Sequence, residues 1–397
     1  MKYIAVFFLL LLACLHVNSQ SYFPPNNSSN WDSISPASLG YCQENIDSLY
    51  NYLDINNTKA FILLKDGKIV LENYFNEHTD TSNWYWASAG KTITSLLVGI
   101  AQEEGHLNIN DTTSNYLSEG WTSCNAAQES KITILNQLSM TSGLDDGVDN
   151  SCCTTDSCLL YLADAGTRWA YHNAPYTLLK NVVENSTGQG INAYAYQKVV
   201  NPIGMNGLFV FEGYNSIFFS TARSMARFGL LILNEGKWND NEILGDDAYF
   251  SAMTNTSQDL NESYGYLWWL NGKNSFMVPQ SQYVFEGSLC SNAPDDMYAA
   301  MGKNGQYINV VPSQNMVWIR MGDVSEEGLV PFNQNNGIWN YINQLVCDQT
   351  TVDVHSTKDQ KIIGITDVLG RPSKVIKNKT LFYLYEDGSV EKKIILD

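Results

Sequence analysis

Strand-like patterns occur near both ends of this chain, and a long, mainly helical stretch separates them. Residues 59–75 contain two apolar runs on either side of Asp66-Gly67, a pair that favours the tight turn of a β-hairpin. Strand patterns return over 298–322, whereas about 106–280 mixes helical patches with loops. Because strands pair with strands, we expect both ends to share one sheet, with the middle inserted as a second lobe.

Helical patterns accompany the strands at both ends. Residues 37–53 place apolar side chains on one helical face, residues 92–104 form an apolar helix that stops near Gly105, and a last amphipathic helix covers about 336–347. These patterns predict an α/β (α+β) fold, with an antiparallel sheet flanked by terminal helices and an inserted, mainly helical lobe. A functional site would lie between sheet and lobe.

Net charge narrows the classes of partner. The 397 residues include 41 acidic and 23 basic side chains, a formal net charge of −18. Phosphate backbones select surfaces rich in Lys and Arg, so we expect no nucleic-acid partner, and an anionic membrane surface is disfavoured for the same reason. A solvated acidic surface that aids solubility is the simpler interpretation.

The N-terminus predicts export. Residues 1–19 are typical of a signal peptide, because Lys2 precedes an apolar run and a small-residue cleavage site ends at Ser19. A competing hypothesis takes the Leu-Leu-Ala-Cys sequence ending at Cys14 as a lipoprotein signal. Under either hypothesis the protein passes the periplasm and is secreted or displayed at the outer-membrane surface.

Composition changes again near the C-terminus. We place the main domain at 35–347 and a polar linker at 348–358. Residues 359–397 contain short β-like runs separated by turns, which predict a small, sandwich-like β module.

Seven cysteines remain after removal of the signal peptide. In an oxidising compartment some of them should pair, with at least one left over. Three of them, Cys152, Cys153 and Cys158, also suggest zinc, but their polar loop offers no spacing for a fourth ligand, so we favour loop disulfides. The seven are Cys42, Cys124, Cys152, Cys153, Cys158, Cys290 and Cys347.

A serine and a lysine lie one helical turn apart at the start of the apolar helix, in the sequence Ser88-Ala-Gly-Lys91. A serine hydroxyl needs a base to act as a nucleophile, and a neutral lysine three residues further along a helix could be that base. The helix N-terminus would also offer N–H groups to an oxyanion. The tetrapeptide alone is weak evidence, because chance provides one or two matches and Ser389-Val-Glu-Lys392 is a second one.

The surroundings of this motif carry a family resemblance. Together with four later segments in the expected order, the helix and its exit resemble the serine β-lactamase and penicillin-binding-protein superfamily, in particular the branch of class C β-lactamases and related esterases. The resemblance covers about 37–347, and it implies acyl transfer without a metal or other cofactor. The five segments are 90–117, 131–144, 219–238, 264–269 and 302–312.

The family's second motif is Tyr-x-Asn, which we place at Tyr171-His172-Asn173 because of its surroundings and its position between the other motifs. The resemblance implies that Tyr171 relays protons and that Asn173 holds Lys91 and the substrate. We interpret His172 as a spacer in this turn and not as a catalytic base. Other Tyr-x-Asn matches start at Tyr74, Tyr307 and Tyr341.

The third motif is Lys-Thr-Gly, on the strand that faces the nucleophile. We match it to Lys303-Asn304-Gly305, so that Lys303 adds positive potential and Gly305 lets the substrate approach the strand. By the family pattern, the N–H groups of Ser88 and Gln306 form the oxyanion hole. Asn304 departs from the usual threonine, which puts recognition of β-lactams in doubt.

The tail has a resemblance of its own. The runs 362–372 and 381–396 are similar to the C-terminal sorting domain of the type IX secretion pathway of Bacteroidetes. That resemblance implies a partner, the secretion machinery, and no role in catalysis. An accessory β domain that binds substrate or partner is the alternative.

We therefore predict a secreted serine hydrolase that forms an acyl-enzyme on a small ester or amide, including short D-amino-acid peptides. A β-lactamase, or a penicillin-binding protein without turnover, has the same motifs. A surface binding module that kept the fold and lost the chemistry is the third hypothesis. Neither the substrate nor the oligomeric state follows from the sequence.

Overall fold

The computed structural model describes residues 21–324, 328–347, 362–367, 370–386 and 390–394. The chain divides into two compact units, one up to Cys347 and one after it. The predicted signal peptide 1–19 and linker 348–358 lie outside the described residues.

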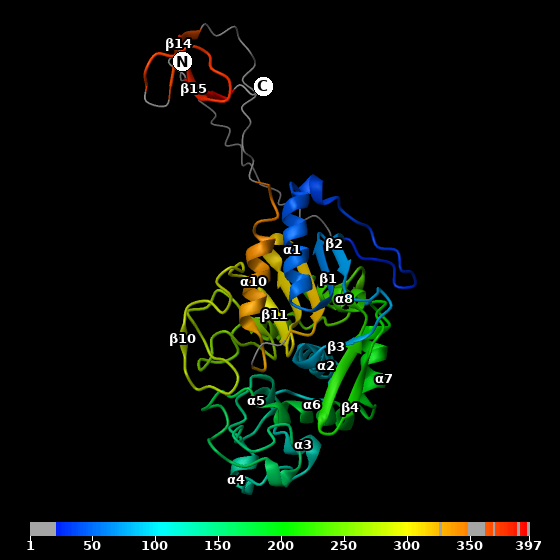
Figure 1. Ribbon diagram of the computed structural model, residues 1–397. Coiled ribbons are helices and arrows are strands. Elements are labelled where there is room, and N and C mark those ends of the chain that lie inside the picture. The colour runs from blue at the N-terminus through cyan, green and yellow to red at the C-terminus, as the bar shows by residue number, and fades with distance from the viewer. Residues whose placement is uncertain (1–20, 325–327, 348–361, 368–369, 387–389, 395–397) are drawn as a thin grey trace, which may run out of the picture. The chain divides into compact units, whose positions relative to one another are not determined.

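A six-stranded antiparallel sheet forms the centre of the larger unit (Figure 1). Its order is β2-β1-β13-β12-β11-β8, so the early hairpin pairs with the late strands and Ile62 lies opposite Ile319. The shared sheet that the sequence predicts is therefore confirmed. Its strands are β1 (Thr58–Lys65), β2 (Lys68–Tyr74), β8 (Trp269–Leu270), β11 (Tyr298–Gly302), β12 (Gln306–Val311) and β13 (Met316–Gly322).

The turn of the β1–β2 hairpin needs its glycine. Asp66 and Gly67 both have positive φ, 53° and 78°, as a two-residue hairpin turn requires. A Cβ on Gly67 would lie 1.9 Å from the carbonyl oxygen of Tyr22, so the leader packs directly on this turn.

Helices cover both faces of the sheet. Helix α8 (Ala222–Leu233) packs on Ile308 and Val317, where a Cβ on Gly229 would meet both side chains. Helix α10 (Phe332–Ile342) instead contacts Asn309 and Trp318, which follow Ile308 and Val317 on their strands. Trp339 Nε1 donates to Asn309 Oδ1, and its ring packs edge-on against Trp318. Neighbouring residues of a strand point to opposite faces, so α8 and α10 lie on opposite sides.

The terminal helices differ in their limits from the predicted ones. A 3₁₀ turn, Pro36–Leu39, ends at Gly40 with φ 76°, and α1 (Gln43–Ile55) starts only after it. Helix α10 ends at Ile342, because the chain turns there to reach the disulfide between Cys42 and Cys347. The two helices still pack together beside the sheet (Figure 1).

The inserted lobe holds short helices and, against expectation, a second small sheet of order β3-β5-β4. Phe209 is the one buried residue of β4, and the exposed side chains of the others hid this hairpin among loop-like residues. The remaining helices are α2 (Lys91–Glu103), α3 (Ser114–Leu117), α4 (Ala126–Glu129), α5 (Ile134–Leu138), α6 (Asn173–Thr187), α7 (Ile191–Ala195) and α9 (Asp247–Met253). The remaining strands are β3 (Trp84–Tyr85), β4 (Leu208–Glu212), β5 (Asn215–Ser220), β6 (Lys237–Trp238), β7 (Asn241–Glu242), β9 (Ser275–Phe276) and β10 (Phe285–Glu286).

The C-terminal unit contains one three-stranded antiparallel sheet in its described part: β14 (Ile362–Thr366), β15 (Thr380–Tyr385) and β16 (Val390–Ile394). Leu381, Tyr383 and Tyr385 alternate along β15 and form its small core. The mixed α/β fold of the whole chain is confirmed. In the part of the chain that the structure describes, every helix is too short or too polar to cross a membrane.

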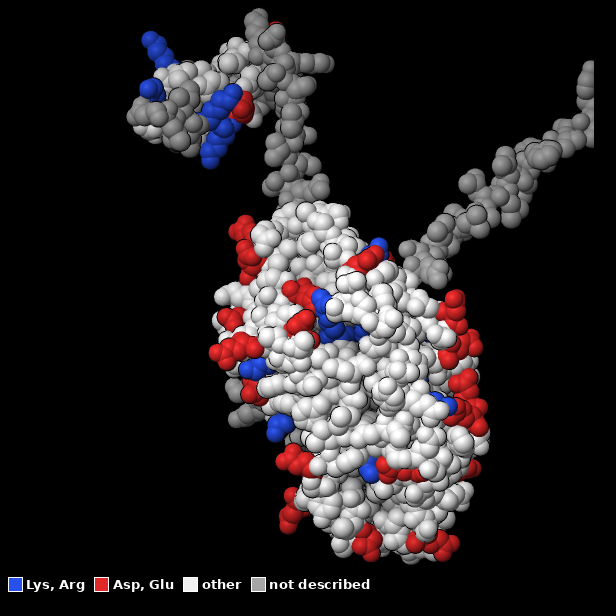
Figure 2. Space-filling view, turned by 90° about the vertical axis from the view of Figure 1, so that its right-hand side faces the viewer, with Lys and Arg blue, Asp and Glu red and all other residues white. Residues whose placement is uncertain are grey.

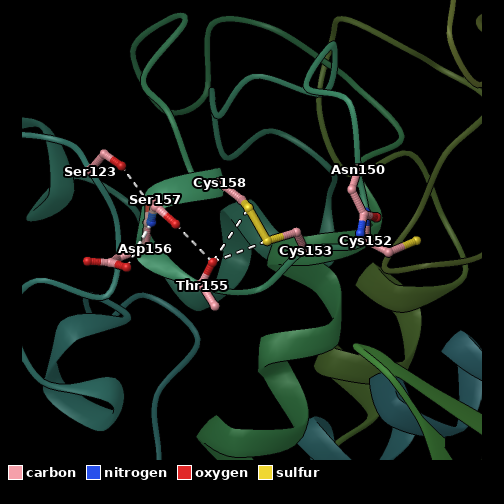
Figure 3. Close-up of a disulfide and its surroundings, with 8 residues drawn as sticks. All are labelled: Ser123, Asn150, Cys152, Cys153, Thr155, Asp156, Ser157 and Cys158. Carbon is pink, nitrogen blue, oxygen red and sulfur yellow. Dashed lines mark hydrogen bonds between the residues drawn. A yellow bond between two sulfur atoms is a disulfide. The ribbon is translucent and has the colours of Figure 1, made fainter.

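Two disulfides form, and the zinc hypothesis fails because its ligands are used up. Cys153 bonds to Cys158 within the polar loop, and the side chain of Cys152 points away from that bond (Figure 3). Cys42 bonds to Cys347. Cys124, Cys152 and Cys290 are free thiols.

On the face in Figure 2, acidic side chains lie mostly towards the edges, with basic side chains interspersed. Dispersed charges of this kind are solvated singly and aid solubility.

Candidate active site

A strained turn presents Ser88 to solvent. Ser88 lies in the 3₁₀ turn Ala87–Gly90 that leads into α2, and Ala87 directly before it has φ 46°, which is unfavourable for a non-glycine residue. Trp86 anchors the turn, because its ring is buried and its Nε1 donates to Ser220 Oγ at 2.8 Å. Ser88 itself is half-buried and stays accessible.

Helix α2 brings Lys91 beneath Ser88. The helix is buried on all sides from Lys91 to Ala101, since it runs between the sheet and the lobe. The Nζ of Lys91 donates to Ser88 Oγ at 3.0 Å and to Asn173 Oδ1 at 2.9 Å. Both acceptors are neutral, so the structure brings these three predicted residues together without a counter-charge.

Burial makes Lys91 a plausible base. Burial lowers the pKa of the Lys91 amine to about 7, although an electrostatic interaction with Cys152 partly opposes this effect. A large fraction of the amine is therefore neutral near physiological pH. The groups that shift its pKa include no carboxylate and no Lys303. A neutral amine 3.0 Å from Ser88 Oγ can accept the hydroxyl proton.

Tyr171 lies on the other side of Ser88. Its ring is buried and stacks on Trp269 at 5.6 Å. Burial raises the pKa of the Tyr171 phenol, and a hydrogen bond with the Ser88 side chain moderates the rise. The phenol therefore stays protonated and can donate to a leaving group. Asn173 follows as the first residue of α6.

His172 is not a base here. Its ring is 2% exposed, and burial lowers its pKa to about 4, so that the imidazole stays neutral and enclosed. It precedes α6 as the N-cap residue, in agreement with its interpretation as a spacer.

The third motif requires a correction. Lys303, Asn304 and Gly305 do not lie on a strand that faces Ser88; they form the turn between β11 and β12. Lys303 is exposed there, and Asn304 binds Tyr85 Oη and Asp323 through its Nδ2.

Gly305 and Gln306 make contacts between the turn and β13. A Cβ on Gly305 would lie 2.2 Å from Nη1 of Arg320, and that nitrogen donates to the carbonyl oxygen of Gly305 at 2.6 Å. Gln306 is completely buried, and its side chain binds both the N–H and the carbonyl oxygen of Gly322. The glycine is needed for the close approach of a buried arginine.

Gly302, which the motif assignment from the sequence missed, lies at the end of β11 against the turn that carries Ser88. A Cβ on it would lie 2.9 Å from the backbone nitrogen of Ser88 and 2.8 Å from that of Ala89. An Ala-x-Gly interpretation of Ala300-Met-Gly302 would have found it, because Ala300 points to the same strand face two residues earlier. The third motif thus carries an alanine where a lysine was expected.

A cavity of about 430 Å³ lies beside the loop around Ser151. The carbonyl oxygen of Ser151 accepts from the N–H of Ala174, directly after Asn173. The arginine that lines this cavity, Arg168, forms an ion pair with Asp146 at 2.7 Å. The cavity is lined by Asp145, Asp146, Gly147, Val148, Asp149, Ser151, Arg168 and Gln280.

Comparison with known proteins identifies the family of this chain. The sequence profile of the Beta-lactamase family matches residues 58–323, well over half of the chain, and the protein belongs to that family. An uncharacterised protein of Alkalihalophilus pseudofirmus is 21% identical over 313 residues, which cover 70% of this chain and 86% of that protein.

Solved structures show the same fold. A Bacillus anthracis protein assigned as a 6-aminohexanoate-dimer hydrolase superposes with a TM-score of 0.60 at 20% identity, covering 81% of this chain and 88% of that one. A family VIII carboxylesterase superposes with a TM-score of 0.56 at 14% identity, covering 77% and 99%.

The reactivity of Ser88 should follow the titration of Lys91. We expect the rate of labelling by a fluorophosphonate probe to rise with pH and to be half-maximal near pH 7, where the pKa of Lys91 lies, because only the neutral amine accepts the proton. Lys91→Arg, which stays charged, should lower the rate by about 100- to 10,000-fold. Half-maximal labelling at about pH 10, as for an exposed lysine, would contradict this assignment.

Gly302→Ala should impair the nucleophile while the fold persists. The added methyl group must displace the Ser88 turn, so labelling of Ser88 should slow by about 100-fold. Gly190→Ala is the matched control, because its Cβ would meet nothing within 4 Å. Equal labelling rates of both variants, with intact folds by circular dichroism, would argue against the contact.

Proposed function

We propose that this protein is a serine hydrolase that cleaves a small ester or amide through an acyl-enzyme. The observation that carries the proposal is the contact of Lys91 Nζ with Ser88 Oγ and Asn173 Oδ1 at 3.0 and 2.9 Å. Ser88 Oγ attacks the substrate carbonyl while Lys91 Nζ takes its proton. Tyr171 then protonates the leaving group and regains a proton from the Lys91 ammonium group, which leaves Lys91 neutral. Water next attacks the acyl carbonyl while these groups accept its proton, and Ser88 Oγ takes that proton back as the acyl group leaves.

The oxyanion would lie between two backbone N–H groups. One belongs to Ser88, at the start of the turn into α2. The second would be that of Lys303, because Gly302 before it lies against the Ser88 nitrogen. Backbone donors held by a turn and a strand end are preorganised for a developing negative charge.

The charges near the site favour a substrate without a carboxylate. No cation extends from β11 towards Ser88, since Ala300 and Gly302 occupy that face and Lys303 is exposed on the turn. The pocket beside the Ser151 loop carries Asp145 and Asp149 besides the paired Asp146. An anionic group of a substrate that reached this pocket would be repelled there. The family VIII carboxylesterase named above is a neighbour in fold that supports an ester substrate.

Two substrates separate the candidate activities. Purified protein should hydrolyse a neutral p-nitrophenyl ester, and Ser88→Ala should lose at least about 1,000-fold in kcat/KM, because it lacks the nucleophile. A chromogenic β-lactam on the same plate should turn over far more slowly. Faster turnover of the β-lactam would favour a β-lactamase, and stoichiometric labelling without turnover a penicillin-binding protein. Equal inactivity of both proteins towards both substrates, with no labelling by the probe, would favour the binding module.

We also propose that the protein is exported, with the C-terminal unit as the address for the type IX machinery. The signal-like residues 1–19 and the sorting-domain resemblance of 359–397 support this. The unit would be recognised at the outer membrane, and the hydrolase would act outside the cell or at its surface.

Truncation after Cys347 tests the export proposal. In a host with a type IX system, the full chain should reach the medium or the cell surface, whereas the truncated chain should stay in the periplasm and remain reactive towards the fluorophosphonate. A host strain that lacks the secretion system is the control and should retain both chains. Surface delivery of the truncated chain would refute the address.

A further inference from the structure

Lys91 must carry a positive charge during the reaction in a place without a counter-ion. Its side chain is 4% exposed, and its two acceptors, Ser88 Oγ and Asn173 Oδ1, are neutral. An ammonium group has three N–H donors, so these two contacts do not complete its surroundings. The charge that appears when Lys91 takes the Ser88 proton needs another source of stabilisation.

Two tyrosine rings provide it. The Nζ of Lys91 lies over the ring of Tyr176 at 4.2 Å from the centroid and over that of Tyr171 at 5.1 Å. Both distances fall within the range in which the negative face of an aromatic ring attracts a cation. Tyr176 is the nearer ring, and the proposed mechanism gives it no other task.

Tyr176 is held in this position from both helices. It follows Asn173 by one turn on α6, and Thr94 follows Lys91 by one turn on α2, so both pairs project from the same side of their helix. The side chain of Thr94 interacts with the Tyr176 hydroxyl and moderates the pKa rise that burial causes there. The ring stays over the lysine because the buried helices leave it no room to turn away.

We propose that Tyr176 is a positioning residue whose ring face stabilises the charged form of Lys91 and thereby sets the pH range in which Lys91 works as a base. The proposal rests on the proposed function in taking Lys91 as the base of the reaction. It assigns Tyr176 a role through Lys91 and no contact with the substrate.

Other groups around Lys91 also shift the balance between its neutral and its ammonium form. Burial favours the neutral amine, whereas an electrostatic interaction with Cys152, on the loop before α6, favours the ammonium form. Tyr171 presents its ring face to Lys91 and its phenol to Ser88. Tyr264 packs edge-on against Tyr171, and burial together with Tyr171 and Tyr176 raises the pKa of Tyr264. The end of β11 contributes only the uncharged Gly302.

The test is a direct titration of Lys91 in two variants. Tyr176→Phe keeps the aromatic ring and loses only the hydroxyl that interacts with Thr94, whereas Tyr176→Leu removes the aromatic ring. With ¹³C-labelled lysine, the Lys91 Cε resonance, assigned by its absence in Lys91→Arg, reports the titration by NMR without any turnover. We expect the Phe variant to titrate as the wild type does and the Leu variant to titrate about one pH unit lower. The pH profile of fluorophosphonate labelling should shift by the same amount and in the same direction.

A matched control separates electrostatics from packing. Tyr249 also packs on α2, where its ring lies against Gly99, away from Lys91. It is 3% exposed, and its hydroxyl donates to the carbonyl oxygen of Ser95. Tyr249→Leu should loosen the same helix and leave the Lys91 titration unchanged. If the Leu variant at 176 does not fold, phenylalanines with increasing ring fluorination at that position weaken the face at nearly constant shape, and the titration should move down stepwise.

Three results would overturn the proposal: an unshifted titration in the Leu or fluorinated variants, an equal shift in Tyr176→Phe and Tyr176→Leu, or an equal shift in Tyr249→Leu. Failure of the proposed function is a separate result, because it would appear as absent turnover by the wild type. The NMR titration would still decide the role of Tyr176 in that case.

Discussion

The site depends on a single unfavourable burial, that of the Lys91 amine between sheet and lobe. Helix α2 is buried from its first residue, Lys91, to Ala101, so the amine is enclosed together with the helix. A carboxylate at hydrogen-bonding distance would hold the amine charged and useless as a base. Neutral acceptors on Ser88 and Asn173 instead position it while leaving its proton affinity low. The position of the base and its basicity thus have the same cause.

Three parts of the chain must meet for this arrangement to exist. The 3₁₀ turn and α2 contribute Ser88 and Lys91, the segment entering α6 contributes Tyr171 and Asn173, and β11 contributes Gly302. Each part is held from outside the site, the turn by Trp86, α6 by its packing on α2, and the strand by the sheet. Rigid support of this kind is what a preorganised catalytic group needs, because small displacements cost large factors in rate.

The sequence predicted those features that short-range rules determine. The β1–β2 hairpin follows from Asp66-Gly67, and the pairing of Ser88 with Lys91 follows from helical spacing. The position of the third motif did not follow, because Gly302-Lys-Asn-Gly305 offers two glycines and either could face the nucleophile. Arg320 decides between them, since it binds the carbonyl oxygen of Gly305 from β13, and such a contact has no local signature. The exposed side chains of β4 likewise concealed a strand whose partner lies across a single turn.

The corrected third motif changes the electrostatics expected of the site. With a lysine on β11, the nucleophile would face a fixed positive charge suited to anionic substrates. With Ala300 and Gly302 there, the cation at hydrogen-bonding distance from Ser88 is Lys91 itself, and its pKa of about 7 makes that charge depend on pH. Negative charge on the oxyanion is then met by backbone dipoles, and positive charge on the lysine by ring faces. Under the proposed function, a site that stabilises both charges with dipoles and quadrupoles gains nothing from a substrate carboxylate and would select a neutral substrate by its shape.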